Sequence, residues 1–412
     1  MQTTKYLAKN IAFVSRSDQG GRGDGCQIMV HRGYAYVGHL FSNGFTILDV
    51  RNPRNPRTVD FIPAPPQTWS LHVQTHEDLL FVVNALDMYN LPVFFEESEY
   101  HSKSVIETLD EKGYRFTAGL RVYNIADPEN PREIGFMPVD GFGLHRMWYV
   151  GGPYLYASAH IRGYTDYVLL IIDVSDPTKP REVGRYWLPG MWVAGGENPS
   201  WRSGRRFSAH HALVPAGSDI AYSSWRDGGM ALLDISDKTK PRMIAHQNLS
   251  PPFGGGTHTT LPLPDRQLVI VADESIADNC ADGIKYIWVV DVREPANPVT
   301  IATMPLPEED DYCKQPGHFG PHNLHEMRPG SFRDSNTIFA TLQNAGVRAY
   351  DIRNPFQPRE LAYFVPPFPE SIVDPRPRPV GVNTTDVYVD PNGLMYVTDY
   401  NAGLYILEYK GG

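Results

Sequence analysis

Five histidines recur at equivalent places in the sequence, each shortly before an apolar segment. They are His72, His145, His211, His258 and His322, and the segments include LLFVVN, YLYASAH and LVIVADE. Imidazole is the commonest neutral metal ligand, and clustered histidines without cysteine suit Fe, Mn, Zn or Cu better than Ca. We therefore expect these five residues to hold a divalent transition metal of this group.

Two of the five positions are ambiguous because a second histidine stands close by. His210 precedes His211, and adjacent residues of a strand point to opposite faces. We favour His211, whose spacing to the next strand resembles that of His145. His322 and His325 could share a metal only across a turn, so this second choice is left open.

A polar set is expected where the second strand of each unit ends, on the same face as the histidines. It contains His39, Asn84, His160, Arg226, Glu274, Gln343 and Tyr400. We name Glu274, Arg226, His160 and Asp386 as candidate catalytic residues. Glu274 and Asp386 would orient the ligand imidazoles, and Arg226 would hold an anionic group of the substrate.

The elements that must position these residues come from a repeated unit. An apolar run ends in Asp or Asn, and a Pro-containing turn and a second β-run follow. Copies lie at 45–62, 120–137, 168–186, 230–246, 286–304 and 347–364. The β-branched apolar run suits a strand buried between neighbouring sheets. The Asp and Pro suit the turn, and the charged last strand suits an outer edge.

Units of this length predict an all-β protein, a seven-bladed β-propeller closed by the N-terminal segment 6–17 joining the last blade. We expect one domain over 1–412. The blades would span roughly 24–66, 70–139, 143–190, 208–251, 256–307, 320–367, and 383–410 together with 6–17. The inner strands of such blades line a central channel, so equivalent strand starts would bring the histidines together.

The runs LLIIDVSDPTKP, MALLDISDKTKP and YIWVVDVREPANP resemble the LVIVD-repeat family of β-propellers. The resemblance covers nearly the whole chain and implies the fold. It implies little about the chemistry, because one fold hosts many functions.

Composition excludes several classes of protein. The 412 residues carry a formal net charge of −10, which disfavours nucleic acid and anionic membranes as partners. No segment approaches 18 consecutive apolar residues. We expect the three cysteines, Cys26, Cys280 and Cys313, to be reduced thiols in a cytoplasmic protein.

Two insertions depart from the repeat, at 88–116 and 188–207. Insertions in repeat folds gather on one face, often the binding face. We expect them to form a lid or the walls of a pocket. Surface decoration, or the contact of a homo-oligomer, is the plainer alternative.

These features predict a metal-dependent enzyme with its site on the propeller axis. An oxygenase-like oxidoreductase acting on a small organic substrate is favoured, and the aromatic-rich insertions suit an aromatic one. The arrangement resembles the carotenoid-cleavage oxygenases, whose imidazoles come from separate blades. It is also similar to propeller polysaccharide lyases, so a metal-dependent lyase or hydrolase is an alternative. A non-catalytic propeller that binds a protein is the second alternative.

Overall fold

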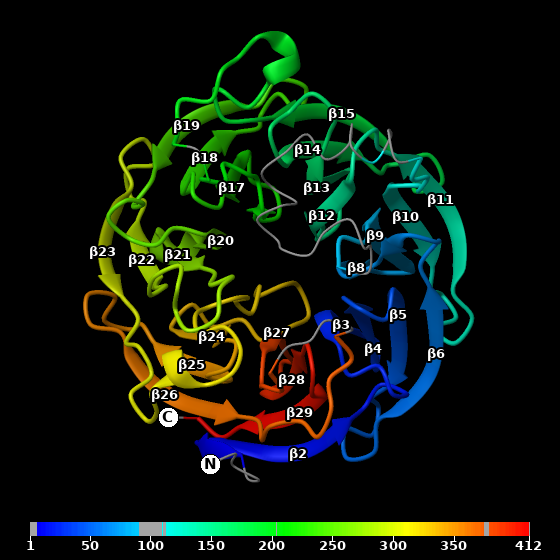
Figure 1. Ribbon diagram of the computed structural model, residues 1–412, viewed down its shortest axis with the longest axis vertical. Helices are drawn as coiled ribbons and strands as arrows, with labels where there is room; N and C mark the ends of the chain where they lie inside the picture. Colours follow the sequence, from blue (N-terminus) through cyan, green and yellow to red (C-terminus); the bar gives the residue numbers. More distant parts are fainter. Residues whose placement is uncertain (1–5, 90–108, 110–112, 203, 375–378, 412) are drawn as a thin grey trace.

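The computed structural model of the chain describes residues 6–89, 109, 113–202, 204–374 and 379–411. Short antiparallel strands are its main regular elements, and their sheets stand around a common centre (Figure 1). The described helices are three short 3₁₀ turns: η1 (Val193–Gly195), η2 (Pro264–Arg266) and η3 (Tyr312–Lys314). The predicted all-β propeller architecture is therefore present. Within the described residues, no helix has the length and apolar character needed to cross a membrane.

The described strands form several four-stranded sheets. In order of pairing these contain β3 (Gly25–His31), β4 (Tyr34–His39), β5 (Gly44–Asp49) and β6 (Arg57–Pro63); β16 (Ala212–Leu213), β17 (Ile220–Ser224), β18 (Met230–Asp234) and β19 (Arg242–Gln247); β20 (Thr257–Leu263), β21 (Leu268–Asp273), β22 (Ile287–Asp291) and β23 (Val299–Thr303); β24 (Thr337–Thr341), β25 (Val347–Asp351), β26 (Arg359–Val365) and β1 (Leu7–Lys9); and β27 (Thr384–Val389), β28 (Leu394–Asp399), β29 (Gly403–Tyr409) and β2 (Ile11–Ser17).

A larger sheet joins two repeat units. It contains β11 (Arg132–Pro138), β10 (Gly119–Asn124), β9 (Leu79–Leu86), β12 (Gly143–Trp148), β13 (Tyr154–His160), β14 (Val168–Asp173) and β15 (Arg181–Tyr186), and both β7 (Thr68–Trp69) and β8 (Val73–His76) pair with β9. β9 and β12 pair only at Ala85 and Gly143. This narrow contact leaves the units recognisable as separate repeats.

The Asp that ends the apolar run caps a turn in successive units, as predicted. In β14 the carboxylate of Asp173 accepts a hydrogen bond from the Ser175 N–H at 3.0 Å. Asp234 accepts one from Ser236 at 2.9 Å, and Asp351 one from Arg353 at 2.8 Å. An Asp oxygen that binds the backbone two residues ahead fixes a tight turn. The repeated turns therefore set the spacing of the strands.

The innermost strands are irregular where they begin. The pairing register shifts between Gly25 and Gln27 in β3, between Thr257 and Thr259 in β20, and between Thr384 and Asp386 in β27. β12 has a similar shift between Leu144 and Met147. A bulge leaves a residue outside the ladder and redirects its side chain. The residues at these bulges include Cys26, His145 and His258, so the irregularity determines what faces the centre.

The N-terminal segment contacts two sheets. β2 pairs with β29, the last strand of the chain, as expected for this part of segment 6–17. β1 pairs instead with β26 of the preceding unit. Asn10 separates them with a φ of 55°, a left-handed conformation that Asn tolerates better than most residues. The expected single strand over 6–17 is therefore two strands.

The expectation of three reduced cysteines is wrong for two of them. Cys280 and Cys313 form a disulfide, and Cys26 is a free, buried thiol. Both bonded cysteines lie in long connections, after β21 and after β23. The backbones of these connections also meet at Asp278 and His318. The sequence separation of 33 residues gave no sign that the two loops approach each other.

Candidate active site

A cavity of about 100 Å³ lies where the innermost strands begin. Its polar wall includes His72, His145, His210, His322, Arg226 and Glu274. Its apolar wall includes Leu40, Trp69, Leu71, Met88, Tyr89 and Ile276. A buried cleft with an apolar wall and a few convergent polar groups is the common form of a small-molecule site.

Five imidazoles from five units lie side by side, and four of them line this cavity, the exception being His258. In order they are His72, His145, His210, His258 and His322; we call them the histidine row. The centroids of neighbouring rings lie 4.8, 4.8, 3.7 and 4.5 Å apart. Four of the five predicted metal ligands are thus brought together, and the fifth place is taken by His210.

Three rings of the row are oriented by the backbone of the following unit. Nδ1 of His72 bonds the carbonyl of His145, Nδ1 of His210 bonds that of His258 at 3.0 Å, and Nδ1 of His322 bonds that of Thr385 at 2.6 Å. A carbonyl oxygen only accepts, so each Nδ1 carries the proton. In the neutral ring Nε2 then keeps a lone pair, the state in which a histidine binds a metal.

His145 differs from its neighbours. Its Nε2 lies 3.0 Å from Nε2 of His210. Because Nδ1 of His210 holds the proton of that ring, His145 must donate through Nε2. His145 Nε2, which carries a proton, has no lone pair for a metal. The lone pair of His210 Nε2 accepts this hydrogen bond, so His210 binds a metal only once His145 no longer donates to it.

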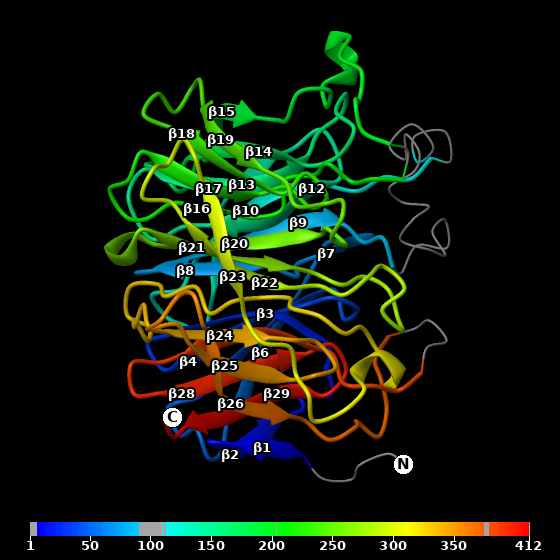
Figure 2. The same cartoon turned by 90° about the vertical axis from the view of Figure 1, so that its left-hand side faces the viewer.

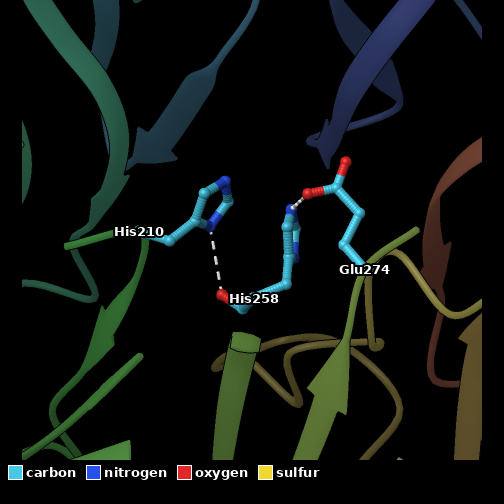
Figure 3. A group of neighbouring side chains, drawn as sticks. All are labelled: His210, His258 and Glu274. Carbon is cyan, nitrogen blue, oxygen red and sulfur yellow. Dashed lines mark hydrogen bonds and ion pairs between the residues drawn. The ribbon is translucent and has the colours of Figure 1, made fainter. Parts of the chain in front are cut away.

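Glu274 lies beside the end of the row, directly after β21. Its Oε1 is 3.4 Å from Nε2 of His322, and its Oε2 is 3.7 Å from Nε2 of His258. Oε2 also accepts a hydrogen bond from Nη1 of Arg226. Among the described residues, one ligand atom from each of His210, His258 and Glu274 lies within 4.8 Å of the other two (Figure 3).

Burial keeps the histidine row neutral. It lowers the pKa of His210, His258 and His72 well below the usual value, helped by neighbouring imidazoles and by Arg146. Burial likewise lowers the pKa of His145 to about 3. A neutral imidazole is the form that coordinates a metal. The row is therefore ready to bind at neutral pH without losing a proton.

The spacing of the donors also fits a common metal ion. Two ligand atoms about 2.1 Å from a tetrahedral metal lie roughly 3.4 Å apart. In the group of His210, His258 and Glu274, Nε2 of His258 and Oε2 of Glu274 are 3.7 Å apart, close to this value, and the three ligand atoms lie within 4.8 Å of one another. Two histidines and a carboxylate are a known ligand set of non-haem Fe(II) and of catalytic zinc. The residues present thus fit a transition metal.

The preference for His211 over His210 is corrected by the structure. His211 lies one residue further along the strand, where its Nε2 is 3.7 Å from Oε1 of Glu326. Arg146, the residue after His145, contacts the same carboxylate at 2.8 Å. His210 is thus equivalent to His145, and His211 to Arg146. Of the second pair, His322 is in the row, whereas His325 bonds the carbonyl of Phe332 at 2.9 Å.

Arg226 lies on the cavity wall beside Glu274, and its backbone has an uncommon conformation. Its φ is 48°, in the left-handed region, and it exchanges two backbone hydrogen bonds of 2.9 Å with Thr257. Such a conformation is uncommon outside glycine and is frequent at functional sites. Arg226 forms an ion pair with Glu274. Its role in holding an anionic group of the substrate stays a prediction.

The other two candidate catalytic residues are not on the cavity wall. His160 stacks on Phe142 at 4.1 Å and packs edge-on against Tyr167 at 5.6 Å, behind the wall. Asp386 follows Thr385, and its Oδ2 accepts the backbone N–H of Ile28 at 3.0 Å. Asp386 therefore links two innermost strands, β27 and β3. Among the described residues, no hydrogen bond is found between Asp386 and an imidazole of the histidine row.

Asp386 should make the stability of the fold depend on pH. Burial raises the pKa of its carboxyl from 3.8 to about 7, so the folded protein binds this proton more tightly than the unfolded chain does. The contribution of Asp386 to the stability is then fully present below pH 4 and is lost as the pH rises through 7, by about 2 kcal/mol between pH 5 and pH 7.

The substitution Asp386→Asn, which keeps an acceptor for Ile28, should remove this part of the dependence. The measurement is urea unfolding of both proteins at pH 5 and pH 7. An unchanged difference between the two pH values in the variant would contradict the assignment.

Cys26 is a cavity residue that the sequence did not reveal. Its Sγ lies 3.8 Å from Nε2 of His72 and 3.9 Å from the hydroxyl oxygen of Tyr400. Burial raises the pKa of the thiol to about 12, so the thiol is neutral. Cys26 occupies the bulge of β3 as His258 occupies that of β20, a correspondence visible only once the units are aligned by register.

The two insertions reach the cavity only in part. Met88 and Tyr89 line it, while most of 88–116 lies outside the described residues. From 188–207, Arg206 lines the cavity. The part around η1 projects away from the centre of the molecule (Figures 1 and 2). The part of this insertion around η1 therefore lies away from the cavity, whereas Arg206 forms part of the cavity wall.

Comparisons with known proteins agree with the architecture. A family model described as the LVIVD repeat matches residues 22–60, 163–187 and 219–248. This match confirms the resemblance drawn from the repeated runs. The chain matches none of the curated protein sequences.

Solved structures are similar in fold at low identity. A hypothetical selenium-binding protein from Sulfolobus tokodaii is 16% identical with a TM-score of 0.51, over 92% of this chain and 91% of that one. The periplasmic gluconolactonase of Pseudomonas aeruginosa is 10% identical with a TM-score of 0.55, over 89% and 96%. The β-propeller domain of Myceliophteria thermophila Cps50 (Swd1) is 9% identical with a TM-score of 0.55, over 98% and 99%. These likenesses show the fold and carry no activity across.

Proposed function

Because the chain is a β-propeller with LVIVD repeats, a fold that leaves the chemistry open, we propose its function from the residues at its cavity. We propose that the protein is a metal-dependent, oxygenase-like oxidoreductase that acts on a small organic substrate. His210, His258 and Glu274 would be the metal ligands. The observation that carries this proposal is the convergence of these three donors, each from a separate segment, within 4.8 Å. Two histidines and one carboxylate with open positions are the ligand set of non-haem Fe(II) oxygenases.

The proposal includes the finer details of the fold. We count seven blades in one domain, taking the larger sheet as two, β8–β11 and β12–β15, with β2 closing the ring beside β29. Closure would remove exposed sheet edges and fix the positions of the innermost strands. A fixed ring of strand starts gives the histidine row its geometry.

The residues around the donors have separable tasks. A bound metal would supply activation of O₂ or polarisation of a substrate oxygen. The carbonyls of His258 and Thr385 hold the Nδ1–H groups of His210 and His322 and so orient both rings. Arg226 holds Oε2 of Glu274, which keeps that carboxylate directed at the row. The apolar wall excludes water from the reacting groups.

A lyase or hydrolase is the second candidate, and one observation favours it. Two histidines and a glutamate also form the ligand set of catalytic zinc, which carries out hydrolysis without redox change. The same three residues would serve, with Arg226 near the substrate. The two proposals differ in the metal they need and in their use of O₂.

The disulfide bears on the compartment. Disulfides persist in oxidising compartments and are rare in the cytoplasm. The Cys280–Cys313 bond therefore favours an oxidising compartment over the expected cytoplasmic one. We propose that the protein works where this bond is maintained.

The test is reconstitution with single metals. Metal-free protein is loaded anaerobically with Fe(II), Mn(II), Cu(II) or Zn(II), and O₂ uptake is followed with a panel of neutral aromatic alcohols, ketones and alkenes. The proposal expects O₂ uptake with a redox-active metal and none with Zn(II). Product formed with Zn(II) and without O₂ would favour the lyase or hydrolase. Failure to bind any of the four metals would favour a protein-binding scaffold.

A further inference from the structure

Three residues that line the cavity have a buried polar atom without a hydrogen-bond partner among the described residues. The atoms are Nε1 of Trp69, Oε1 of Gln343 and Nε of Arg226. Trp69 and Gln343, which are uncharged, are 3% and 1% exposed. Buried polar atoms are nearly always hydrogen-bonded, so each orphan calls for an explanation. A ligand in the cavity that both residues line is the simplest one.

Trp69 offers a donor. It lies in β7, with its ring edge-on to Tyr89 at 5.5 Å. An indole Nε1–H donates and cannot accept. Its partner in a ligand must therefore be an acceptor such as a carbonyl or ether oxygen.

Gln343 offers an acceptor. Its Nε2 donates to the carbonyl of Ser275 at 2.8 Å, and this bond fixes which end of the amide is oxygen. Its φ of 48° is left-handed, as it is at Arg226, and both residues line the cavity. The partner of its Oε1 must be a donor such as a hydroxyl group.

Two arginines of the wall form ion pairs within the protein, although Nε of Arg226 has no hydrogen-bond partner among the described residues. Arg226 contacts Glu274, and Arg206 contacts Asp166 at 3.1 Å. The remaining wall contains Leu40, Leu71 and Met88 and the rings of Trp69 and Tyr89. A charged ligand would have to break one of these ion pairs, whereas an uncharged ligand with an apolar body would not.

We infer that the substrate is an uncharged aromatic molecule with a hydrogen-bond acceptor that binds Trp69 and, at a separate position, a hydroxyl group that donates to Gln343. This rests on the proposed function in that the cavity is taken as the substrate site. Trp69 and Gln343 are then specificity residues, because a buried polar group discriminates strongly against a ligand that leaves it unpaired.

The test uses three probes of nearly equal size, measured by calorimetry under nitrogen so that no turnover occurs. They are 4-(hydroxymethyl)acetophenone, 4-ethylacetophenone, which lacks the donor, and 4-ethylbenzyl alcohol, which lacks the carbonyl. The first should bind roughly tenfold more tightly than either of the others, the effect of one satisfied buried hydrogen bond.

Two variants assign each preference to a residue. Gln343→Met should abolish the preference over 4-ethylacetophenone, and Trp69→Phe should abolish the preference over 4-ethylbenzyl alcohol. Because each comparison is a ratio of two ligands on one protein, general damage to the cavity cancels. The preferences of the unmodified protein test the inference even where a variant does not fold.

Three results would overturn the inference: equal binding of the three probes to the unmodified protein, ratios that survive both substitutions, or tighter binding of 4-acetylbenzoate, the charged analogue. This outcome is independent of the metal. Metal bound without a ligand preference leaves the proposed function standing and removes the substrate class. A preference without any metal does the reverse.

Discussion

The substitution His210→Ala should weaken metal binding by more than roughly 100-fold, whereas His211→Ala should leave it nearly unchanged. Loss of a residue that only supports a ligand costs about 10- to 100-fold in metal affinity, so loss of a ligand should exceed that range. His210 contributes one of three converging donors, while His211 contacts Glu326 outside the cavity. The measurement is competition for Fe(II) or Zn(II) between the metal-free protein and a coloured chelator.

His211→Ala is a matched control because both histidines are buried neighbours in one segment, 5% and 2% exposed. General damage to the fold should therefore be similar in the two variants. Equal losses of affinity would mean that the substitutions act through the fold. A loss confined to His211→Ala would assign the site to the other side of the strand.

Removing the disulfide should have the largest effect on stability. With a sequence separation of 33 between Cys280 and Cys313, the double substitution to Ser should lower the free energy of unfolding by about 3.5 kcal/mol, because the unfolded chain regains the freedom of the open loop. Urea unfolding of the two proteins measures this difference. A reducing agent should lower the stability of the unmodified protein by the same amount and leave the variant unchanged.

Thiol counting checks the same bond independently. The denatured, unreduced protein should show one reactive thiol, from Cys26, and three after reduction. Three thiols before reduction, together with unfolding insensitive to the reducing agent, would contradict the assignment.

The architecture was predictable because its signal is local and repeated. The Asp-capped turn and the apolar run before it are read from a dozen adjacent residues, and they recur with the same contacts at Asp173, Asp234 and Asp351. The grouping of four histidines also followed from their equivalent places in the repeat. Strand period and repeat length were sufficient for these predictions.

The predictions that were wrong all depended on the exact placement of single residues. The choice between His210 and His211 depends on register at the start of a strand, where a shift of one residue turns a side chain to the other face. Cys26 shares the bulge position with His258, but a cysteine among histidines does not show in the sequence pattern that the other units share. The Cys280–Cys313 bond joins two long connections whose meeting depends on the packing of neighbouring units. His160 and Asp386 end up behind the wall for the same reason.

The account depends most on whether three donors on the propeller axis bind a metal ion. Elemental analysis of the purified, unmodified protein tests this directly, since it needs no substrate and no knowledge of the reaction. We predict close to one first-row transition metal per chain, retained through gel filtration and absent from the His210→Ala protein. A folded protein that holds no such metal, or that holds it equally well without His210, would contradict the account.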